Sequence, residues 1–456
     1  MRETRWSDKV IEAVAAILVH EKEVFVIKRQ PNLRAFPGYM AFPGGKIDVG
    51  DHVGPAQHAL LEAHPDAHVG ALFRELSEEL EFDVAAALSK GDVRDITLFG
   101  TAITPVFEKV RFTAFYYKIV LARKPVFKLD KNEISEGEWG TADSLCELFR
   151  EGRALMVVPM RNTLLELARD ISVTGCEPFN IKIPDGELAC IELIHGLRTI
   201  PVPSNTLPPA STTNALLLGD RDQTQVLVDP SPESAEVYSW LINTLTRRRL
   251  DAILISHHHP DHHERAFELA REKNVPVLLS GITLQRIKSD FGEQYIANTQ
   301  LIIITEGTEI TRWKGQAIRA YELPGHDDGM LGLAPDNLAW FFVADLVQSL
   351  GSIVIPDEGG DLVDYLASLQ RVIDLNPKVI LPSHGIASGG TEILKRAYAH
   401  RIDRENQIRP LYRAGASTTQ ILDSVYPGLG EELKGLAEQT IHQHIRKLEA
   451  DRESPR

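Results

Sequence analysis

Short apolar runs and amphipathic segments alternate along the N-terminal third of the chain. Apolar runs of strand length occupy residues 13–19, 24–28 and 111–121, and residues 72–80 repeat their apolar positions with the period of a helix. A strand turns successive side chains to opposite faces, whereas a helix returns to the same face after three to four residues. This pattern predicts a mixed structure in which a sheet and at least one helix share a core.

The same alternation continues further along the chain. Residues 215–218, 226–228 and 252–255 are short and wholly apolar, as is typical of strands buried on both faces. Polar helical segments follow at 417–426 and 433–450. We therefore expect a multidomain protein of the α/β and α+β classes that ends in a small helical tail. A three-helix unit of this size suggests a winged helix, and a plain pair of packed helices is the alternative. The predicted domains are residues 1–175, 190–395 and 396–456.

Composition narrows the class of protein. A chain of 456 residues is too long for one ordinary core, and 43% hydrophobic with 25% charged residues is usual for a soluble globular protein. The formal net charge is −15, so binding to nucleic acid would require a local basic patch. Three scattered cysteines do not suggest a disulfide framework, and no apolar run reaches membrane-spanning length. We expect a cytoplasmic protein without a membrane partner.

A run of histidines follows the apolar segment 252–255. Within residues 256–263, SHHHPDHH, the frame His-x-His-x-Asp-His selects His257, His259, Asp261 and His262. Residues that follow a buried strand lie on a loop whose position the sheet fixes. Imidazole nitrogens with a carboxylate suit zinc, and manganese and iron accept the same donors. The alternative is a His-rich surface tract that binds metal loosely, which would need neither a buried strand before it nor partners downstream.

Three further donors follow strand-like or turn segments: His326, Asp345 and His384. Asp345 ends the apolar run 338–344, and His384 follows the run 379–381. Taken in order with the histidine frame, these motifs resemble the four ligand-bearing motifs of the metallo-β-lactamase fold hydrolases. The resemblance implies an αβ/βα sandwich with a dinuclear metal centre. One ligand set is then His257, His259 and His326, the other is Asp261, His262 and His384, and Asp345 bridges the two. His258 and His263 fall outside the frame and are expected as neighbours of the ligands.

Two metal ions this close would act together on one water molecule. Each cation favours the deprotonated form of the water, which supplies a nucleophile near neutral pH. This predicts hydrolysis of an ester, thioester, amide or phosphodiester, and the sequence leaves the choice open. Asp261 is the candidate catalytic residue, as a proton relay.

A second group of carboxylates lies in the helical segment of the first domain. Glu75, Glu78 and Glu79 fall on one side of a helix, where like charges repel unless something compensates them. Carboxylate oxygens suit magnesium or manganese, which would remove the repulsion. A solvated acidic helix face is the alternative. Gly44 and Gly45 favour the metal hypothesis, because glycines before such a helix let the backbone approach a ligand closely.

Together these residues resemble the Nudix box, and the first domain is expected to be the α/β/α sandwich of a Nudix hydrolase. The resemblance implies cleavage of a diphosphate, with Glu75, Glu78 and Glu79 as metal-binding and catalytic residues. The box departs from the family pattern between Gly45 and Arg74, where residues are inserted. The isolated glutamate of the box therefore has three candidates: Asp51, Glu62 and Asp66. Glu81 replaces the glycine that usually ends the helix in a left-handed conformation.

A more specific resemblance lies just upstream. Arg29, Arg34 and Gly38 precede the run 42–45 at the spacing seen in Nudix enzymes that cleave coenzyme A. Guanidinium groups bind phosphate in a bidentate manner, although two surface arginines at a strand end explain the pattern equally well. The predicted substrate contacts are Arg29, Arg34, Gly44, Gly45 and Arg74.

The C-terminal tail carries a local excess of positive charge. From Lys395 to Arg413 there are six Lys or Arg residues against two acids. Residues 399–408 resemble the segment that joins a metallo-β-lactamase domain to a winged helix in a subgroup that includes an endoribonuclease. Such a stretch could contact phosphates, but a solvated helix face explains it as well, and no aromatic stacking platform accompanies it.

Three functions therefore remain open. The first is a bifunctional hydrolase with magnesium or manganese in the first domain and two zinc ions (or manganese or iron) in the second. Its substrate would be a small molecule bearing a diphosphate or an acyl group, such as coenzyme A or a derivative. The second is an endoribonuclease that cuts single-stranded RNA at the dinuclear centre. The third is a Nudix domain that senses a ligand without cleaving it and regulates its neighbour.

Overall fold

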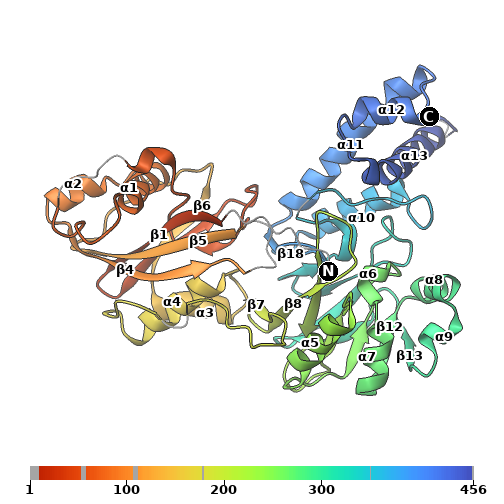
Figure 1. The fold of residues 1–456 in the computed structure, drawn as a ribbon, viewed down its shortest axis with the longest axis horizontal. Coiled ribbons are helices and arrows are strands. Elements are labelled where there is room, and N and C mark those ends of the chain that lie inside the picture. Colours follow the sequence, from red (N-terminus) through yellow and green to blue (C-terminus); the bar gives the residue numbers. More distant parts are fainter. Residues whose placement is uncertain (1–9, 53–57, 106–110, 177–178, 350, 454–456) are drawn as a thin grey trace. The chain divides into compact units, whose positions relative to one another are not determined.

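The computed structural model describes residues 10–52, 58–105, 111–176, 179–349 and 351–453. The chain divides into two compact units (Figure 1). One comprises residues 1–184 and 191–195, and the other comprises residues 185–190 and 196–456. The helical tail that the sequence predicts as a third domain belongs to the second unit. Its first helix, α11 (Glu392–Arg413), runs continuously through the predicted boundary at 395/396.

The first unit is built on a six-stranded sheet. The strand order is β3-β2-β1-β5-β4, and β6 pairs with β2 off this path. The strands are β1 (Val10–His20), β2 (Glu23–Arg29), β3 (Met40–Ala41), β4 (Val93–Ile103), β5 (Arg111–Leu121) and β6 (Ile134–Thr141). The three strands expected from the apolar runs of this region are confirmed as β1, β2 and β5. The neighbours β1 and β5 are parallel, and the other pairs are antiparallel.

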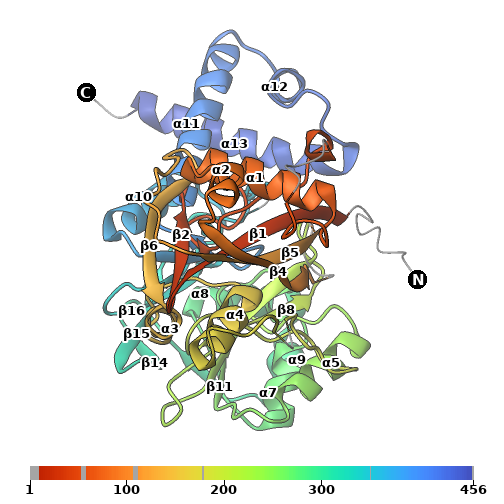
Figure 2. The same cartoon turned by 90° about the vertical axis from the view of Figure 1, so that its left-hand side faces the viewer.

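Helices cover both faces of this sheet (Figure 2). Helices α1 (Asp66–Leu80) and α2 (Val84–Ser89) lie on one face, and α3 (Ala142–Arg150) and α4 (Val158–Arg169) lie on the other. The alternation along β1 explains the layering. Val14, Ala16 and Leu18 pack in the core that α1 shares, whereas Ile17 and Val19 pack in the core that α3 and α4 share. The short helix η1 (Val49–His52) and strand β7 (Ile191–Ile194) complete the unit.

The carboxyl end of α1 shows how this chain replaces the missing glycine. Glu81 adopts the left-handed conformation, with φ 50° and ψ 37°. The Glu81 and Phe82 amides donate to the carbonyls of Ser77 and Leu76, as in a helix that glycine would end. The backbone geometry of the motif is therefore retained, at the conformational cost of a non-glycine residue.

The second unit contains two sheets. The first has the order β13-β12-β11-β10-β9-β8, and its strands β10 to β13 run parallel. These strands are β8 (Leu197–Pro203), β9 (Thr212–Leu218), β10 (Val226–Val228), β11 (Ala252–Leu254), β12 (Val277–Leu279) and β13 (Leu301–Ile303). The second sheet follows the chain from β14 to β19. Its strands are β14 (Glu309–Trp313), β15 (Gln316–Glu322), β16 (Leu331–Pro335), β17 (Phe341–Phe342), β18 (Val379–Leu381) and β19 (Ser388–Gly389).

Helices α5 and α7 bury the apolar side chains of the first of these sheets. Leu217, Leu227 and Ile253 pack with Leu241 of α5 and Phe267 of α7. The helices before the tail are α5 (Ala235–Leu245), α6 (Pro260–His263), α7 (Ala266–Lys273), α8 (Gly281–Phe291), α9 (Glu293–Ile296), η2 (Ala344–Leu346) and α10 (Leu362–Leu375).

One predicted strand is much shorter than the apolar run that suggested it. Of residues 338–344, only β17 (Phe341–Phe342) is a strand, and η2 follows at once. Leu338 and Ala344 both have positive φ angles, 51° and 46°, which interrupt the extended backbone. The run is apolar because all of its last five residues are fully buried, so burial and not strand length set its composition.

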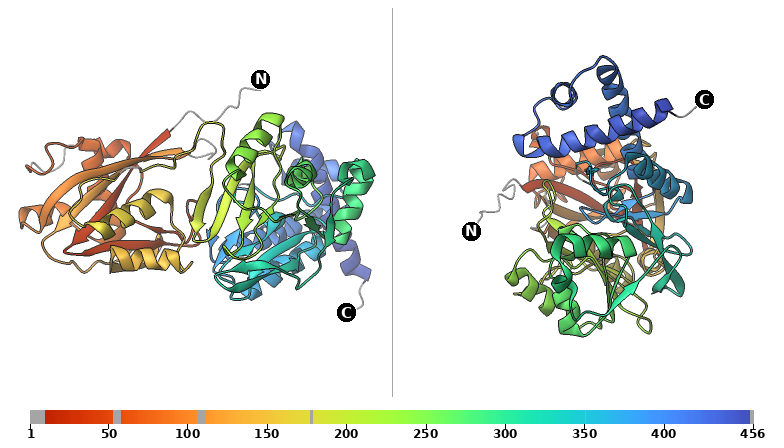
Figure 3. Two further views of the ribbon diagram at one scale, coloured as in Figure 1. Left: turned by 90° about the horizontal axis from the view of Figure 1, so that it is seen from below. Right: turned by 90° about the vertical axis from the view of Figure 1, so that its right-hand side faces the viewer.

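Three helices form the C-terminal tail, drawn in blue in Figure 3. They are α11, α12 (Thr418–Val425) and α13 (Glu431–Glu453). Ile408, Ile421 and Ile441, one from each helix, share a buried core. The helical segments predicted near 417–426 and 433–450 are thus confirmed. Among described residues beyond Gly389 the chain forms no strand, so the wing of a winged helix stays a prediction. None of the described helices combines the length and apolar character needed to span a membrane.

Replacing Glu81 with glycine is expected to stabilise α1 by about 1 kcal/mol, because glycine adopts the left-handed conformation without steric cost. The Glu81–Lys128 ion pair that would be lost joins two exposed side chains and contributes little. Native-state hydrogen exchange of the α1 amides in the full chain measures the effect. Asn274→Gly is the matched control at the left-handed end of α7, where a smaller gain is expected because asparagine tolerates this conformation. Faster exchange in Glu81→Gly than in the parent chain would contradict the interpretation.

Candidate functional site

The histidine frame lies where the parallel strands of the second unit end. His257 and His259 follow β11, and His262 lies on α6. The donors expected downstream come from the second sheet of the unit: His326 follows β15, Asp345 lies in η2 after β17, and His384 follows β18. Each of these segments follows a strand, and the strand fixes its position.

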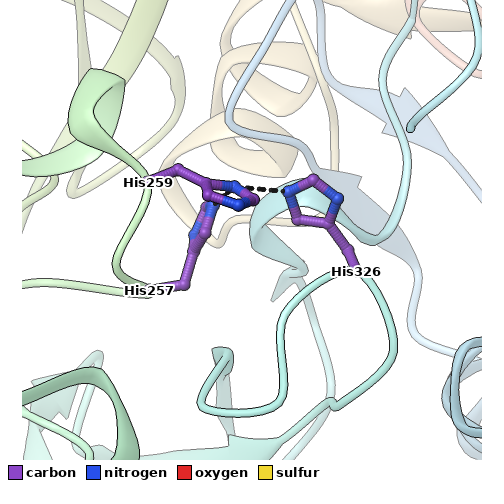
Figure 4. Close-up of side chains that lie close together, drawn as sticks. All are labelled: His257, His259 and His326. Atoms are coloured by element: carbon purple, nitrogen blue, oxygen red, sulfur yellow. Dashed lines mark hydrogen bonds between the residues drawn. The ribbon is translucent and has the colours of Figure 1, made fainter. Parts of the chain in front are cut away.

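Three imidazoles form the first cluster (Figure 4). His259 Nδ1 is 3.1 Å from His257 Nε2 and 2.9 Å from His326 Nε2, and the three rings face one another. Burial, followed by the neighbouring imidazoles, holds the pKa of His257 and of His259 well below the ordinary value. These rings are therefore neutral near pH 7, which leaves nitrogen lone pairs free to bind a cation.

A second cluster joins Asp261, His262 and His384. Asp261 Oδ2 lies 3.5 Å from His384 Nε2 and 3.8 Å from His262 Nε2. His262 and His384 are almost completely buried, while the Asp261 side chain retains 15% exposure. Asp261 is therefore the residue of this cluster that a substrate or water reaches most easily.

Asp345 lies between the two clusters. Its Oδ2 is 3.4 Å from His384 Nε2 and 3.6 Å from both His262 Nε2 and His326 Nε2. It thus contacts histidines of both sets, as expected of a bridging group. The structure brings all the donors expected from the sequence motifs of this unit into one place.

The polar atoms of the clusters indicate that cations complete the site. His262 Nε2, His384 Nε2 and Asp345 Oδ1 are buried without a hydrogen-bond partner. Burying such atoms unpartnered costs on the order of 1–3 kcal/mol each, so an arrangement that retains several requires a ligand to satisfy them. Sets of three donors within 4.8 Å of one another include His257–His259–His326 and Asp261–His262–His384. The residues present therefore fit a pair of metal ions.

The charges of the second cluster also favour a bound cation. Burial alone would lower the pKa of His262, but Asp261, Asp345 and Asp229 outweigh it and hold that pKa well above the ordinary value. Burial would raise the pKa of Asp345, yet His384 and His262 hold it well below the usual range. The surrounding carboxylates therefore favour a positive charge at this point, and a metal ion supplies one.

Outer contacts that the sequence did not reveal fix the orientation of three of the rings, those of His262, His326 and His384. The Nδ1–H of His326 donates to the carbonyl of Val354 at 2.7 Å, and that of His384 donates to Thr212 at 2.9 Å. Asp229, fully buried, accepts from His262 Nδ1 at 2.9 Å and from the Ser256 hydroxyl at 2.6 Å. Each contact leaves Nε2 as the free lone pair. Of these partners only Asp229 could have been found from the sequence, because it is an acid that directly follows the apolar strand β10, which pairs with β11.

The two histidines outside the frame have structural partners. His258 Nδ1 hydrogen-bonds to the buried carboxylate of Asp327, which ties the first histidine loop to the loop of His326. His263 contacts the carbonyl of His258 at 2.8 Å and the hydroxyl of Tyr295 at 3.0 Å. They are neighbours of the candidate ligands, in agreement with the sequence hypothesis.

In the first unit, Arg74 occupies the centre of the acidic helix face. Its Nη1 is 2.8 Å from Glu75 Oε1 and 3.1 Å from Glu78 Oε2. Its Nε and Nη2 bind both oxygens of Asp51, at 2.9 Å and 3.0 Å. Of the three candidates for the isolated acid of the motif, the structure therefore brings Asp51 to the site, whereas Glu62 and Asp66 are exposed. The repulsion within the helix is relieved here by a guanidinium group.

The glycines of this motif make room for the carboxylates. The Gly44 amide donates to Glu79 Oε2 at 2.8 Å, and a Cβ on Gly45 would lie 2.2 Å from Glu75 Oε1. Glu79 is buried, its Oε1 has no hydrogen-bond partner, and burial raises its pKa to about 8. Burial also raises the pKa of Glu75. Within the described residues, no set of three metal donors as close as those of the second unit includes these glutamates.

The arginines predicted to bind a diphosphate lie near this motif. Arg29 Nε donates to the carbonyl of Ala35 at 3.2 Å, and its charge acts on Glu79. Arg34 is exposed in the segment that follows β2. The structure thus leaves Arg34 accessible to a ligand but uses one donor of Arg29 internally.

Several basic side chains of the tail form hydrogen bonds or ion pairs within the second unit. Arg401 is buried and donates to the carbonyl of Ile353, and Arg409 Nη2 pairs with Glu405 at 2.6 Å. Arg404 donates to the carbonyl of Val425. Fewer positive charges therefore face solvent than the sequence count suggests.

Comparisons with known proteins concern mainly the second unit. The family description "Metallo-beta-lactamase superfamily" matches residues 208–384. "Beta-lactamase-like protein 2 homolog" of Drosophila melanogaster is 26% identical over 251 residues, covering 52% of this chain and 82% of that protein. "Atrochrysone carboxyl ACP thioesterase" of Pseudocercospora fijiensis is 25% identical, covering 52% and 70%. "Hydroxyacylglutathione hydrolase" of Wigglesworthia glossinidia brevipalpis is 27% identical, covering 36% and 58%.

Solved structures are also similar to the chain, at low identity. A metallo-beta-lactamase family protein from Thermus thermophilus has 20% identity and a TM-score of 0.46, covering 57% of this chain and 95% of that one. A Nudix hydrolase from Alicyclobacillus acidocaldarius has 20% identity and a TM-score of 0.31, covering 37% and 99%. The family match encloses every donor of the two histidine clusters. The similarity of this chain to the metallo-beta-lactamase superfamily therefore covers the whole candidate metal centre.

Proposed function

We propose that the second unit is a hydrolase with a dinuclear metal centre. The first metal would be held by His257, His259 and His326, the second by Asp261, His262 and His384, and Asp345 would bridge them. The observation that carries this proposal is the convergence of these donors around buried ring nitrogens and a carboxylate oxygen that have no other partner. Zinc suits the imidazole-rich set best, and manganese and iron accept the same donors.

The residues of the site have separable roles in such a reaction. Bound cations would lower the pKa of a water molecule and polarise the substrate oxygen. Thr212, Val354 and Asp229 hold the imidazoles in the tautomer that directs Nε2 inward. Asp261, the more accessible carboxylate, accepts the proton that the attacking water releases and delivers it to the leaving group.

The substrate that we favour for this unit is a small molecule with an ester or thioester bond. Two relatives support the choice, because their names describe a thioesterase and a hydroxyacylglutathione hydrolase. Cleavage of single-stranded RNA is the second candidate for the same centre. The burial of Arg401 and the pairing of Arg409 weaken that alternative, since they reduce the charge available to phosphates.

For the first unit we propose magnesium- or manganese-dependent cleavage of a diphosphate, with coenzyme A or a derivative as the substrate. Glu79 supports an active site, because its unpartnered buried oxygen and raised pKa are typical of a metal ligand or proton acceptor. Glu75 and Glu78 would complete the metal site, and the exposed Arg34 would contact phosphates, whereas Arg74, predicted as a further phosphate contact, has its guanidinium nitrogens engaged by Asp51, Glu75, Glu78 and the Lys46 carbonyl. The two units would then cut an acyl thioester and the diphosphate of its carrier.

The metal centre predicts about two transition-metal ions per chain after zinc loading. His259→Ala removes a nitrogen that the other two histidines of its cluster face, so we expect it to lose metal while the chain stays folded. Elemental analysis measures the metal, and circular dichroism checks the fold. His58→Ala, a histidine of the first unit, is the matched control and should bind as the parent chain does. A parent chain that binds no transition metal after zinc loading would refute the dinuclear centre.

The proton-transfer role predicts a loss of turnover in Asp261→Asn. We expect kcat for thioester hydrolysis to fall by about 10² to 10⁴, the usual contribution of a general base, with a smaller change in KM. The assay panel should include thioesters, esters, lactones and single-stranded RNA at physiological salt. Efficient RNA cleavage that His259→Ala abolishes, with no acyl hydrolysis, would favour the ribonuclease instead.

The diphosphatase proposal predicts activity that depends on magnesium or manganese and is lost in Glu78→Gln and Glu79→Gln. Glu62→Gln, at an exposed glutamate, should have no effect, and neither should His259→Ala, because a different unit carries it. Coenzyme A should be cleaved faster than nucleoside triphosphates, and Arg34→Ala should raise KM. If no diphosphate in a broad panel is turned over, the first unit is a ligand sensor and this proposal is wrong.

A further inference from the structure

The segment from Ile353 to Asp361 lies between η2 and α10 and contacts the loop that carries His326. The carbonyl of Val354 accepts the Nδ1–H of His326 at 2.7 Å, and the Asp361 amide donates to the carbonyl of Gly325 at 2.9 Å. Both ends of this segment, which we call the 353–361 segment, therefore contact the turn that carries His326. A displacement of the segment would move or release that ring.

Helix α11 of the tail holds one end of the segment. Arg401, only 3% exposed, donates to the carbonyl of Ile353, the neighbour of Val354. Its guanidinium group also lies over the ring of Tyr365, 5.3 Å from the centroid. The Tyr365 hydroxyl donates at 2.8 Å to the carbonyl of Leu346, which follows Asp345 in η2. One buried cation of the tail thus contacts Ile353 and Tyr365, and these in turn adjoin or contact the elements that hold two of the candidate ligands, His326 and Asp345.

Helix α13 holds the other end. Gln443, 1% exposed, donates to the carbonyls of Pro356 and Gly360 at 2.6 Å and 3.0 Å. Asp357, between these two positions, contacts His442 at 3.0 Å, and its carbonyl accepts from the Arg446 guanidinium at 3.2 Å. Because Gln443 joins two carbonyls four residues apart, it fixes the curvature of the segment as well as its position.

We propose that the C-terminal helices act as part of the metal site, with Arg401 and Gln443 as positioning residues for His326. The inference rests on the proposed dinuclear centre. It assigns the tail a function that does not require nucleic acid: the tail orders the segment whose carbonyl fixes the tautomer and orientation of one ligand. Partners of metal-bound histidines of this kind typically change metal affinity by about 10-fold to 100-fold when they are altered.

The burial of Arg401 makes this coupling strong. A buried guanidinium is costly unless it is hydrogen-bonded, so the native arrangement strongly favours contact with the 353–361 segment. The coupling is also reciprocal, because a contact that strengthens metal binding must be strengthened by the metal. Metal loading should therefore increase the protection of α11 and α13 against hydrogen exchange.

The test compares zinc affinity in the full chain for Arg401→Met and Gln443→Leu. We expect one of the two zinc ions to bind about 10-fold to 100-fold more weakly in each variant, measured by competition with a chelator. Arg401→Lys retains the charge and can still donate a hydrogen bond to the Ile353 carbonyl, so it should recover part of the loss. Arg404→Met is the matched control: it lies on α11 and contacts Val425 and Tyr426 within the tail, so both zinc affinities should remain within about twofold of the parent chain.

A second readout separates positioning from general destabilisation. Cobalt(II) loaded into the same centre gives an absorption spectrum that depends on ligand geometry, and this spectrum should change in Arg401→Met and not in Arg404→Met. If Arg401→Met does not fold, Gln443→Leu carries the same test. Unchanged affinity and spectrum in both tail variants, with two ions bound by the parent chain, would overturn the inference alone. A parent chain that binds no metal would overturn the dinuclear centre together with it.

Discussion

The buried group of imidazoles and carboxylates in the second unit is the constraint on which its structure depends. His257, His262 and Asp345 lie where water cannot solvate them, so each polar atom needs a partner from the protein or a bound cation. The backbone carbonyls of Thr212 and Val354 and the carboxylate of Asp229 satisfy the outward nitrogens. The atoms that face the centre of the site, such as His262 Nε2 and Asp345 Oδ1, have no hydrogen-bond partner in the protein. The strands β11, β15 and β18 hold the loops that carry the histidines in place. The ends of these strands therefore determine where the candidate metal donors lie.

In the first unit the main electrostatic constraint is the repulsion between neighbouring carboxylates. Its carboxylates surround Arg74 rather than a group of histidines, and this guanidinium offsets their mutual repulsion without a bound metal. The arrangement keeps Glu75 and Asp51 in place by internal contacts. Glu79, in contrast, keeps one oxygen unpartnered beside Gly44. A unit organised in this way is stable before any ligand arrives, which fits both an enzyme and a ligand sensor.

Local patterns in the sequence predicted a large part of the structure, and the misses have physical causes. The strands β1, β2 and β5 and the histidine frame followed from periodicity and spacing, because each of these signals is contained in a short window. The shortened strand β17 was missed because apolar composition reports burial and cannot reveal the positive φ angles of Leu338 and Ala344. The partners Val354 and Arg401 were missed because a backbone carbonyl has no sequence signature and a contact across 48 residues has no local pattern.

The continuity of α11 gives the tail a mechanical property. The helix contains 22 residues and is therefore about 33 Å long, with Arg401 near its middle and Ile408 in the core of the three-helix tail. Pro410 interrupts the backbone hydrogen bonding near the carboxyl-terminal end, so the part that moves as one unit is the stretch before it, which contains both Arg401 and Ile408. A tilt of this stretch at Ile408 would displace Arg401 and, through the carbonyls of Ile353 and Val354, the ring of His326.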